Sequence, residues 1–304
     1  MKGLDWERDG WDWPHREHSR FVHAGGSGIR WHVQVMGSGP VLFLLHGTGA
    51  STHSFRALMP ILARRFTVVA PDLPGHAFSR MPDRFEPTLR NTAAALEELL
   101  AALEIRPELA VGHSAGSALL VEMALHGALP ARQLVALAGA MVPFRGVGTA
   151  LFGPAARLLA RSAMAPRLIA LRARNTRNVE RVVQGTGSQL DPGGVDFYRR
   201  LASNPGHVAG VLRMLAVWDL EPLFAALPRL DRPLLLVAGD QDRAVPLAQA
   251  YTVAAAIPRA RVEVVRGAGH LLHEEQPGTV TRLILEAADP ATAGPSPVTA
   301  GGTV

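Results

Sequence analysis

The chain has 304 residues, no cysteine and a formal net charge of +5. The lack of cysteine excludes disulfide bonds, thiolate catalysis and cysteine-ligated metals, and 48% apolar against 19% charged residues indicates a folded protein. No apolar run is long enough to span a bilayer, and residues 1–9 lack the apolar core of a signal peptide. No dense basic run with interleaved aromatic residues indicates nucleic-acid binding. We therefore expect a cytoplasmic protein that binds no nucleic acid.

Residues 1–20 are polar and rich in tryptophan and histidine, which predicts an irregular N-terminal arm. We expect its tryptophans to pack on the surface of the body; the alternative is a contact site for a partner or a flat ligand. The next segment, Phe21–Met36, alternates apolar and polar residues around Gly25–Gly28. That pattern predicts a β-hairpin with a glycine-rich turn.

Short apolar segments then alternate with helix-forming segments along most of the chain. The predicted strands are Pro40–Leu45, Thr67–Ala70, Leu109–Val111, Leu134–Ala138, Leu234–Ala238 and Arg261–Val265. The predicted helices are Ser54–Arg64, Leu89–Leu103, Ser117–Leu125, Pro246–Ala256 and Gln276–Ala288. Repeated strand–helix units predict an α/β fold, a mostly parallel, twisted sheet with helices on both faces.

The alternation is interrupted over residues 141–226, where helical segments and chain breakers replace the strands. We expect this block to form a helical cap over the carboxyl ends of the strands, where ligands bind in open α/β sheets. The predicted organisation is an arm (1–20), an α/β core (21–140 and 227–288), the inserted cap (141–226) and a disordered tail (289–304).

The stretch Gly112–Gly116 reads Gly-His-Ser-Ala-Gly and stands between a predicted strand and a predicted helix. This context favours a nucleophile elbow, a strained turn that exposes the oxygen of Ser114. The amide of Ala115, at the start of the helix, would point at a developing oxyanion. The five-residue pattern also arises by chance in a glycine-rich chain, so the rest of the sequence must supply a base, an acid and a second oxyanion donor.

Two later strands end in polar loops that supply the base and the acid. Asp240 and Asp242 follow the strand at Leu234–Ala238, and His270 follows the strand at Arg261–Val265. The order serine, acid, histidine and the common sheet edge both fit a hydrolase triad.

Two acids and two histidines compete for these roles. We prefer Asp242 because it lies four residues before Pro246, in a loop that leads into a helix, and we expect Asp240 to stabilise a turn. His270 is the expected base, and His273 is expected to line the start of the next helix.

The stretch His46-Gly-Thr-Gly follows the first buried strand. Its glycines allow close backbone approach, so we expect the amide of Thr48 to be the second oxyanion donor; an ordinary glycine-rich turn is the alternative. Together with Pro71–His76 and the three loops above, this motif resembles the α/β-hydrolase superfamily over about residues 20–288. One departure is Ala77, where many members of the superfamily have glycine.

The resemblance implies an α/β-hydrolase fold with an inserted cap, and serine hydrolysis of an ester-like substrate without a cofactor or a metal. A serine at the elbow, rather than an aspartate, argues against haloalkane dehalogenase and epoxide hydrolase chemistry. The segments Asp12–Val22, Trp31–Gln34 and His46–Ser54 also look like the BchO proteins. These are magnesium chelatase accessory proteins of bacteriochlorophyll biosynthesis.

The narrower resemblance implies a tetrapyrrole or ester ligand and association with magnesium chelatase subunits. A non-hydrolytic accessory protein, which carries a tetrapyrrole or contacts the chelatase, stays open as the alternative.

The predicted cap carries an excess of positive charge. Between Arg145 and Arg213 there are 11 arginines against Glu180, Asp191 and Asp196. Arginine pairs well with carboxylates such as the propionates of a tetrapyrrole. A solvated surface in an arginine-biased chain is the interpretation we slightly favour, and peripheral membrane contact through a basic amphipathic surface is a third.

Overall fold

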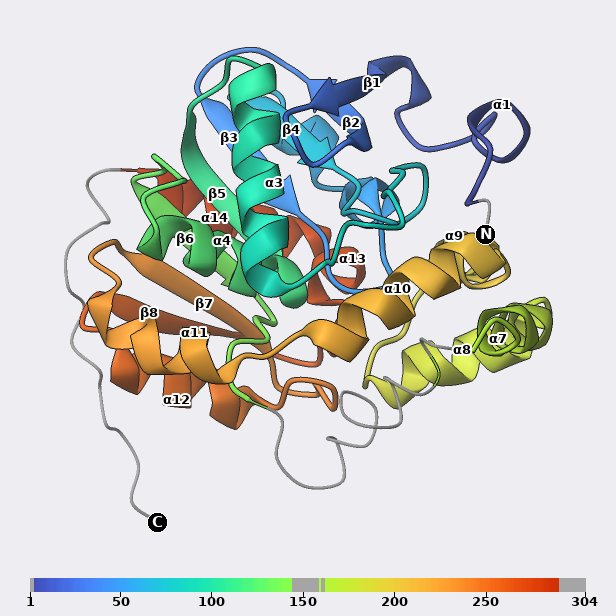
Figure 1. Ribbon diagram of the computed structural model, residues 1–304. Helices are drawn as coiled ribbons and strands as arrows, with labels where there is room; N and C mark the ends of the chain where they lie inside the picture. The colour runs from blue at the N-terminus through green and yellow to red at the C-terminus, as the bar shows by residue number, and fades with distance from the viewer. Residues whose placement is uncertain (1–2, 144–158, 160–161, 290–304) are drawn as a thin grey trace.

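The computed structural model describes residues 3–143, 159 and 162–289 (Figure 1). Its centre is one eight-stranded sheet with the strand order β1-β2-β4-β3-β5-β6-β7-β8. The two strands β1 and β2 pair antiparallel with each other, β2 pairs antiparallel with β4, and β3 to β8 run parallel. The predicted fold class, a mostly parallel sheet with helices on both faces, is confirmed.

The strands fall where the apolar segments predict them. Their bounds are Ser19–Ala24 (β1), Ile29–Met36 (β2), Val41–Leu45 (β3), Thr67–Pro71 (β4), Pro107–His113 (β5), Gln133–Leu137 (β6), Leu234–Gly239 (β7) and Ala260–Val265 (β8). Successive side chains of β3 point to opposite faces: Phe43 and Leu45 enter one core, and Leu42 and Leu44 the other. Burial on both faces explains why this strand is wholly apolar.

Helices cover the two faces unequally. One core contains residues of Leu89–Ala102 (α3), Ala115–Leu125 (α4), Glu221–Ala226 (α11) and Leu247–Ala256 (α12). The other contains residues of Met59–Leu62 (α2), Leu272–Glu275 (α13) and Pro277–Ala288 (α14). No described helix is long and apolar enough to cross a membrane.

Between β6 and α11 the structure describes four helices from end to end and, among the same described residues, no strand. They are Ala165–Ala173 (α7), Thr176–Gly185 (α8), Pro192–Ala202 (α9) and Pro205–Val217 (α10). They project to one side of the sheet (Figure 1). We keep the word cap for this helical insertion; its domain boundaries stay a prediction, and the predicted tail falls almost wholly outside the described residues.

The arm is more ordered than its composition predicts. It forms a short helix, Trp6–Asp9 (α1), and a 3-10 turn, Arg16–His18 (η1). Trp13 is buried and donates from Nε1 to Thr52 Oγ1 at 3.2 Å, as expected for packing on the body, whereas Trp11 is 71% exposed. The arm thus packs on the body through buried apolar side chains, Leu4 and Trp13 among them.

The predicted helix Ser54–Arg64 is wrong as a single element. The chain instead forms a 3-10 turn, Thr52–Phe55 (η2), followed by the single turn of α2. Pro60 sits near the start of α2, where its missing N–H costs nothing, and so divides the segment. Ala77 has φ of 41°, a left-handed backbone that favours glycine and explains the glycine of many superfamily members at this position.

Candidate active site

Ser114 occupies the turn between β5 and α4 with φ of 50° and ψ of −115°. This conformation is unfavourable for a residue with a Cβ and costs about 1–3 kcal/mol, so it persists only because the surroundings impose it. A Cβ on Gly112 would lie 2.5 Å from the backbone of Gly116, and one on Gly116 would lie 2.2 Å from the Leu45 carbonyl oxygen. The two glycines of the motif are therefore needed for strand and helix to pack around Ser114.

Asp242 and His270 come together from the loops that follow β7 and β8. Asp242 Oδ2 lies 2.8 Å from His270 Nδ1, and its side chain is buried. The other oxygen, Oδ1, accepts hydrogen bonds from the amides of Ala244 and Val245, both at 2.8 Å. These two amides fix the carboxylate so that one oxygen faces the imidazole, which leaves His270 Nε2 as the ring nitrogen free to exchange a proton.

Asp240 takes a different position. Its Oδ1 accepts a hydrogen bond from the amide of Gly267 at 2.7 Å, and the side chain is exposed. This contact ties the two loops together at their outer end, the turn-stabilising arrangement expected from the sequence.

The loop after β3 lies against Ser114. A Cβ on Gly47 would be 3.0 Å from the Ser114 Cβ. Residues 47–50 form a turn, closed by the Ala50 amide and the Gly47 carbonyl at 3.1 Å, with Gly49 at φ of 80°. The turn's own hydrogen bond does not use the Thr48 amide, and the Ala115 amide, as the first of α4, has no acceptor within its helix.

Three further histidines hold this region, and the sequence interpretation assigned none of them such a role. His113 Nε2 donates to the carbonyl oxygen of His270 at 3.0 Å, and its ring packs at a tilt against that of His273, with centroids 4.3 Å apart. His207 of α10 accepts from the Ala77 amide at Nδ1, so its Nε2 donates to the Gly49 carbonyl at 3.2 Å. The position of His113 inside the Gly-His-Ser-Ala-Gly motif was the available signal for it.

Burial keeps these histidines neutral. It lowers the pKa of His207 to about 4 and that of His273 to about 3, and it lowers the pKa of His113 well below its ordinary value. The neutral rings of His113 and His273 near His270 add no positive charge that would oppose its protonation.

A buried polar cluster joins the cap to the core beside the histidine loop. Glu274 of α13 accepts from Tyr198 of α9 at 2.6 Å and forms an ion pair with Arg56. Burial raises the pKa of Glu274 to about 7, against the opposing effect of the guanidinium. No short sequence motif links these residues, because they are brought together only by the docking of α9.

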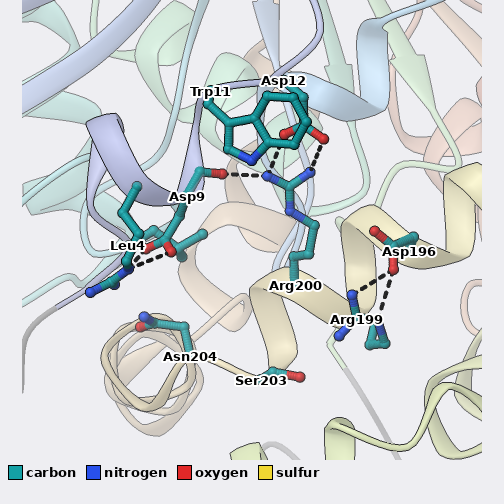
Figure 2. Close-up of a pocket in the computed structure, with 10 residues that line it drawn as sticks. Leu4, Asp9, Trp11, Asp12, Asp196, Arg199, Arg200, Ser203 and Asn204 are labelled. Carbon is teal, nitrogen blue, oxygen red and sulfur yellow. Dashed lines mark hydrogen bonds and ion pairs between the residues drawn. The ribbon is translucent and has the colours of Figure 1, made fainter.

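A cavity of about 470 Å³ lies elsewhere, at the seam between the arm and α9. Figure 2 shows Arg200 there, ion-paired with Asp12 at 2.7 Å, beside a separate pair of Arg199 with Asp196. None of the predicted site residues lines this cavity. Within the described ranges, no group of three histidine or acidic side chains is arranged to hold a metal ion.

The sequence comparisons show the family to which the chain belongs. Residues 40–277 match the model of the alpha/beta hydrolase fold family, and the chain belongs to that family. It is also similar to the magnesium-chelatase 30 kDa subunit of Rhodobacter capsulatus, with 38% identity over 90% of this chain and 96% of that protein. That similarity confirms the narrower resemblance to the BchO group.

The chain is also similar to an esterase and to solved structures of the same fold. A pimeloyl-[acyl-carrier protein] methyl ester esterase of Xanthomonas oryzae is 30% identical over 79% of this chain and 91% of its own length. An α/β-hydrolase fold protein from Burkholderia ambifaria superposes with a TM-score of 0.73 at 25% identity, over 88% of this chain and all of that one. An esterase from Thermogutta terrifontis, at 23% identity and a TM-score of 0.68 over 88% of this chain and 97% of its own, shows the same fold.

Proposed function

We propose that this protein is a serine hydrolase that cleaves an ester-like substrate with Ser114, His270 and Asp242. The observation that carries the proposal is the 2.8 Å contact of Asp242 with His270, at the sheet edge where Ser114 sits in its strained turn. A serine hydroxyl is a weak nucleophile, and an imidazole oriented by a carboxylate is the arrangement that activates it.

In the proposed reaction, His270 Nε2 takes the proton of Ser114 as its oxygen attacks the ester carbonyl. The amides of Thr48 and Ala115 stabilise the oxyanion that forms, and Asp242 stabilises the imidazolium. His270 then gives the proton to the leaving alkoxide, which departs as the alcohol. Water, activated by His270, cleaves the acyl-serine, releases the carboxylic acid and restores the hydroxyl.

We place the physiological substrate in bacteriochlorophyll biosynthesis, near the magnesium chelatase step. The similarity to a magnesium-chelatase subunit supports this setting, and the similarity to a methyl ester esterase supports an ester, such as an ester of a tetrapyrrole. The alternative is an accessory protein that carries a tetrapyrrole or contacts chelatase subunits without hydrolysis. The positive charge of the cap favours neither the hydrolase nor the accessory protein.

We also propose that the cap touches the membrane from the cytoplasmic side. Met164, Leu168 and Leu171, at and on α7, are each more than half exposed. Exposed arginines at positions 167, 172, 174, 177 and 181 lie on and between α7 and α8, and Glu180 is the one acid on these two helices. Apolar tips among guanidinium groups match the interface of an anionic lipid layer.

Hydrolysis of a short acyl ester tests the proposed function. The purified protein should turn over p-nitrophenyl acetate, and Ser114→Ala should lower kcat by about 10⁴-fold or more without a change in thermal stability. Equal turnover by the two proteins would assign the activity to another group and favour the accessory role.

A further inference from the structure

One turn of the cap, Thr186–Ser188, reaches the loop that carries Asp242. The amide of Arg243 donates to the Thr186 carbonyl at 3.0 Å. Gly187 has φ of 86°, and a Cβ at this position would lie 1.9 Å from the Gln241 carbonyl oxygen. Both contacts fall on immediate neighbours of Asp242, one on each side.

The same turn also reaches the loop that carries His270. The amide of Leu271 donates to Ser188 Oγ at 2.8 Å, and Ser188 is fully buried. A Cβ on Gly269 would lie 2.3 Å from the carbonyl carbon of Gly187. These contacts again fall on the two residues that flank the proposed catalytic residue.

The two loops share one backbone hydrogen bond of their own near the site, from the Gln241 amide to the Ala268 carbonyl at 3.0 Å. Asp240 also joins the loops at their outer end through the Gly267 amide. The rest of the loop backbone is irregular, so the position of Asp242 relative to His270 also depends on what packs beside the loops. Gly187 lies against both Gln241 and Gly269, with backbone contacts too close to admit a methyl group on either glycine. A shift of this turn would therefore displace Asp242 relative to His270.

We infer that the cap turn Thr186–Ser188 is a positioning element that sets the contact between Asp242 and His270, with Ser188 and Gly187 as its key residues. The inference rests on the proposed hydrolase function and adds that the cap helps to assemble the triad. Ser188 acts through the backbone of the histidine loop, and Gly187 acts by permitting contact with the acid loop.

Two matched pairs of variants test this. Ser188→Ala removes the acceptor of the Leu271 amide, and its control is Ser203→Ala, which removes a buried hydroxyl that has no partner among the described residues. Gly187→Ala forces a methyl group against Gln241, and its control is Gly185→Ala, at the end of α8, where a Cβ meets nothing within 4 Å. Melting temperatures identify any variant that fails to fold.

On a short acyl ester we expect Ser188→Ala to lower kcat by about 10-fold with little change in KM, because misplacement of a base by a fraction of an ångström costs rate. The rising limb of the pH profile of kcat/KM should move to lower pH, since a loosened carboxylate stabilises the imidazolium less. Gly187→Ala should act in the same direction, and both controls should match the parent protein.

A spectroscopic readout separates this inference from the proposed function. The Nδ1 protons of His270 and His32 each point at a buried carboxylate, since His32 Nδ1 lies 2.8 Å from Asp72 Oδ2. Both should give far-downfield proton resonances, assigned with His270→Ala and His32→Ala. Ser188→Ala should shift or broaden the His270 signal and leave that of His32 unchanged.

An unchanged His270 signal in folded Ser188→Ala would overturn the inference, as would unaltered kcat and pH profile in an active protein. Absence of esterase activity in the parent protein would overturn the proposed function, and the resonance would still decide whether the turn positions the pair.

Discussion

Asp242 Oδ2 lies 2.8 Å from His270 Nδ1, while Asp240, two residues earlier, accepts from the amide of Gly267 instead. The two carboxylates occupy one loop and have separate tasks. The difference arises because the amides of Ala244 and Val245 both donate to Asp242 Oδ1, which orients Oδ2 toward the imidazole.

Amide substitutions should separate the two acids. Asp242→Asn should lower kcat by roughly 10⁴-fold, since an amide can no longer fix the imidazole tautomer or stabilise its charge. Asp240→Asn keeps an acceptor for the Gly267 amide and should change kcat little. Steady-state kinetics on a short acyl ester measure both, and a larger loss from Asp240→Asn would show that the acid is wrongly assigned.

Acid should destabilise the fold because of its buried neutral histidines. The folded pKa values of His207 (about 4) and His273 (about 3) lie below the unfolded value. Between these values and about pH 6.5, the unfolded chain binds protons that the folded chain does not, so the free energy of unfolding falls as pH falls. Each of the two residues should account for about 2 kcal/mol between pH 7.5 and 5.

Glu274 has the opposite effect on the free energy of unfolding. Its pKa is raised to about 7, so between about pH 4.5 and 7 the folded chain binds a proton that the unfolded chain has released. It offsets part of the histidine effect as pH falls from 7. Urea midpoints between pH 5 and 7.5 measure the balance, which we expect to favour the histidines. His273→Leu should flatten the profile, and an equally steep profile in this variant would count against the assignment to His273.

The exposed face of α7 should bind anionic lipid. The protein should sediment with phosphatidylglycerol vesicles and much less with phosphatidylcholine vesicles, and added salt should weaken binding, because exposed charges are screened over about 8 Å at physiological ionic strength. Leu168→Ser should lower the bound fraction more than Tyr251→Ser, a matched change of an exposed apolar residue on α12. Equal binding to both lipids would contradict the proposal.

A tetrapyrrole in the cap should be recognised through its carboxylates. Protoporphyrin should quench tryptophan fluorescence at lower concentration than its dimethyl ester, and salt should reduce that difference. Among the described arginines of the cap, Arg199 and Arg200 form ion pairs with carboxylates of the protein, and Arg213 donates to backbone carbonyls. These three guanidinium groups therefore already have partners within the protein. Equal, salt-independent affinity for acid and ester would leave the charge of the cap without a role in ligand choice.

The sequence predicted the centre of the sheet well because its central strands are buried on both faces and therefore read as unbroken apolar runs, as at Leu42–Leu45. It also predicted the sheet edge at which Ser114, Asp242 and His270 lie, since they stand in the loops that follow β5, β7 and β8 and the carboxyl ends of parallel strands meet at one edge.

The missed features depend on contacts between distant segments. Nothing in the local sequence around Ser188 or Glu274 indicates that α9 and the turn before it dock beside His270. The segment Ser54–Arg64 has helical periodicity, but Pro60 and the 3-10 turn of η2 divide it. Local patterns therefore locate the proposed catalytic groups and leave open what holds them in place.

Covalent labelling tests the central claim most directly. A fluorophosphonate reacts readily with a serine whose oxygen is activated, and in this account the Asp242–His270 pair provides that activation for Ser114 in its strained turn. Mass spectrometry of the labelled, digested protein should place the adduct on Ser114, and Ser114→Ala and His270→Ala should stay unlabelled. A folded parent protein that remains unlabelled, or carries the adduct on another residue, would contradict the claim that Ser114 is the nucleophile of a hydrolase.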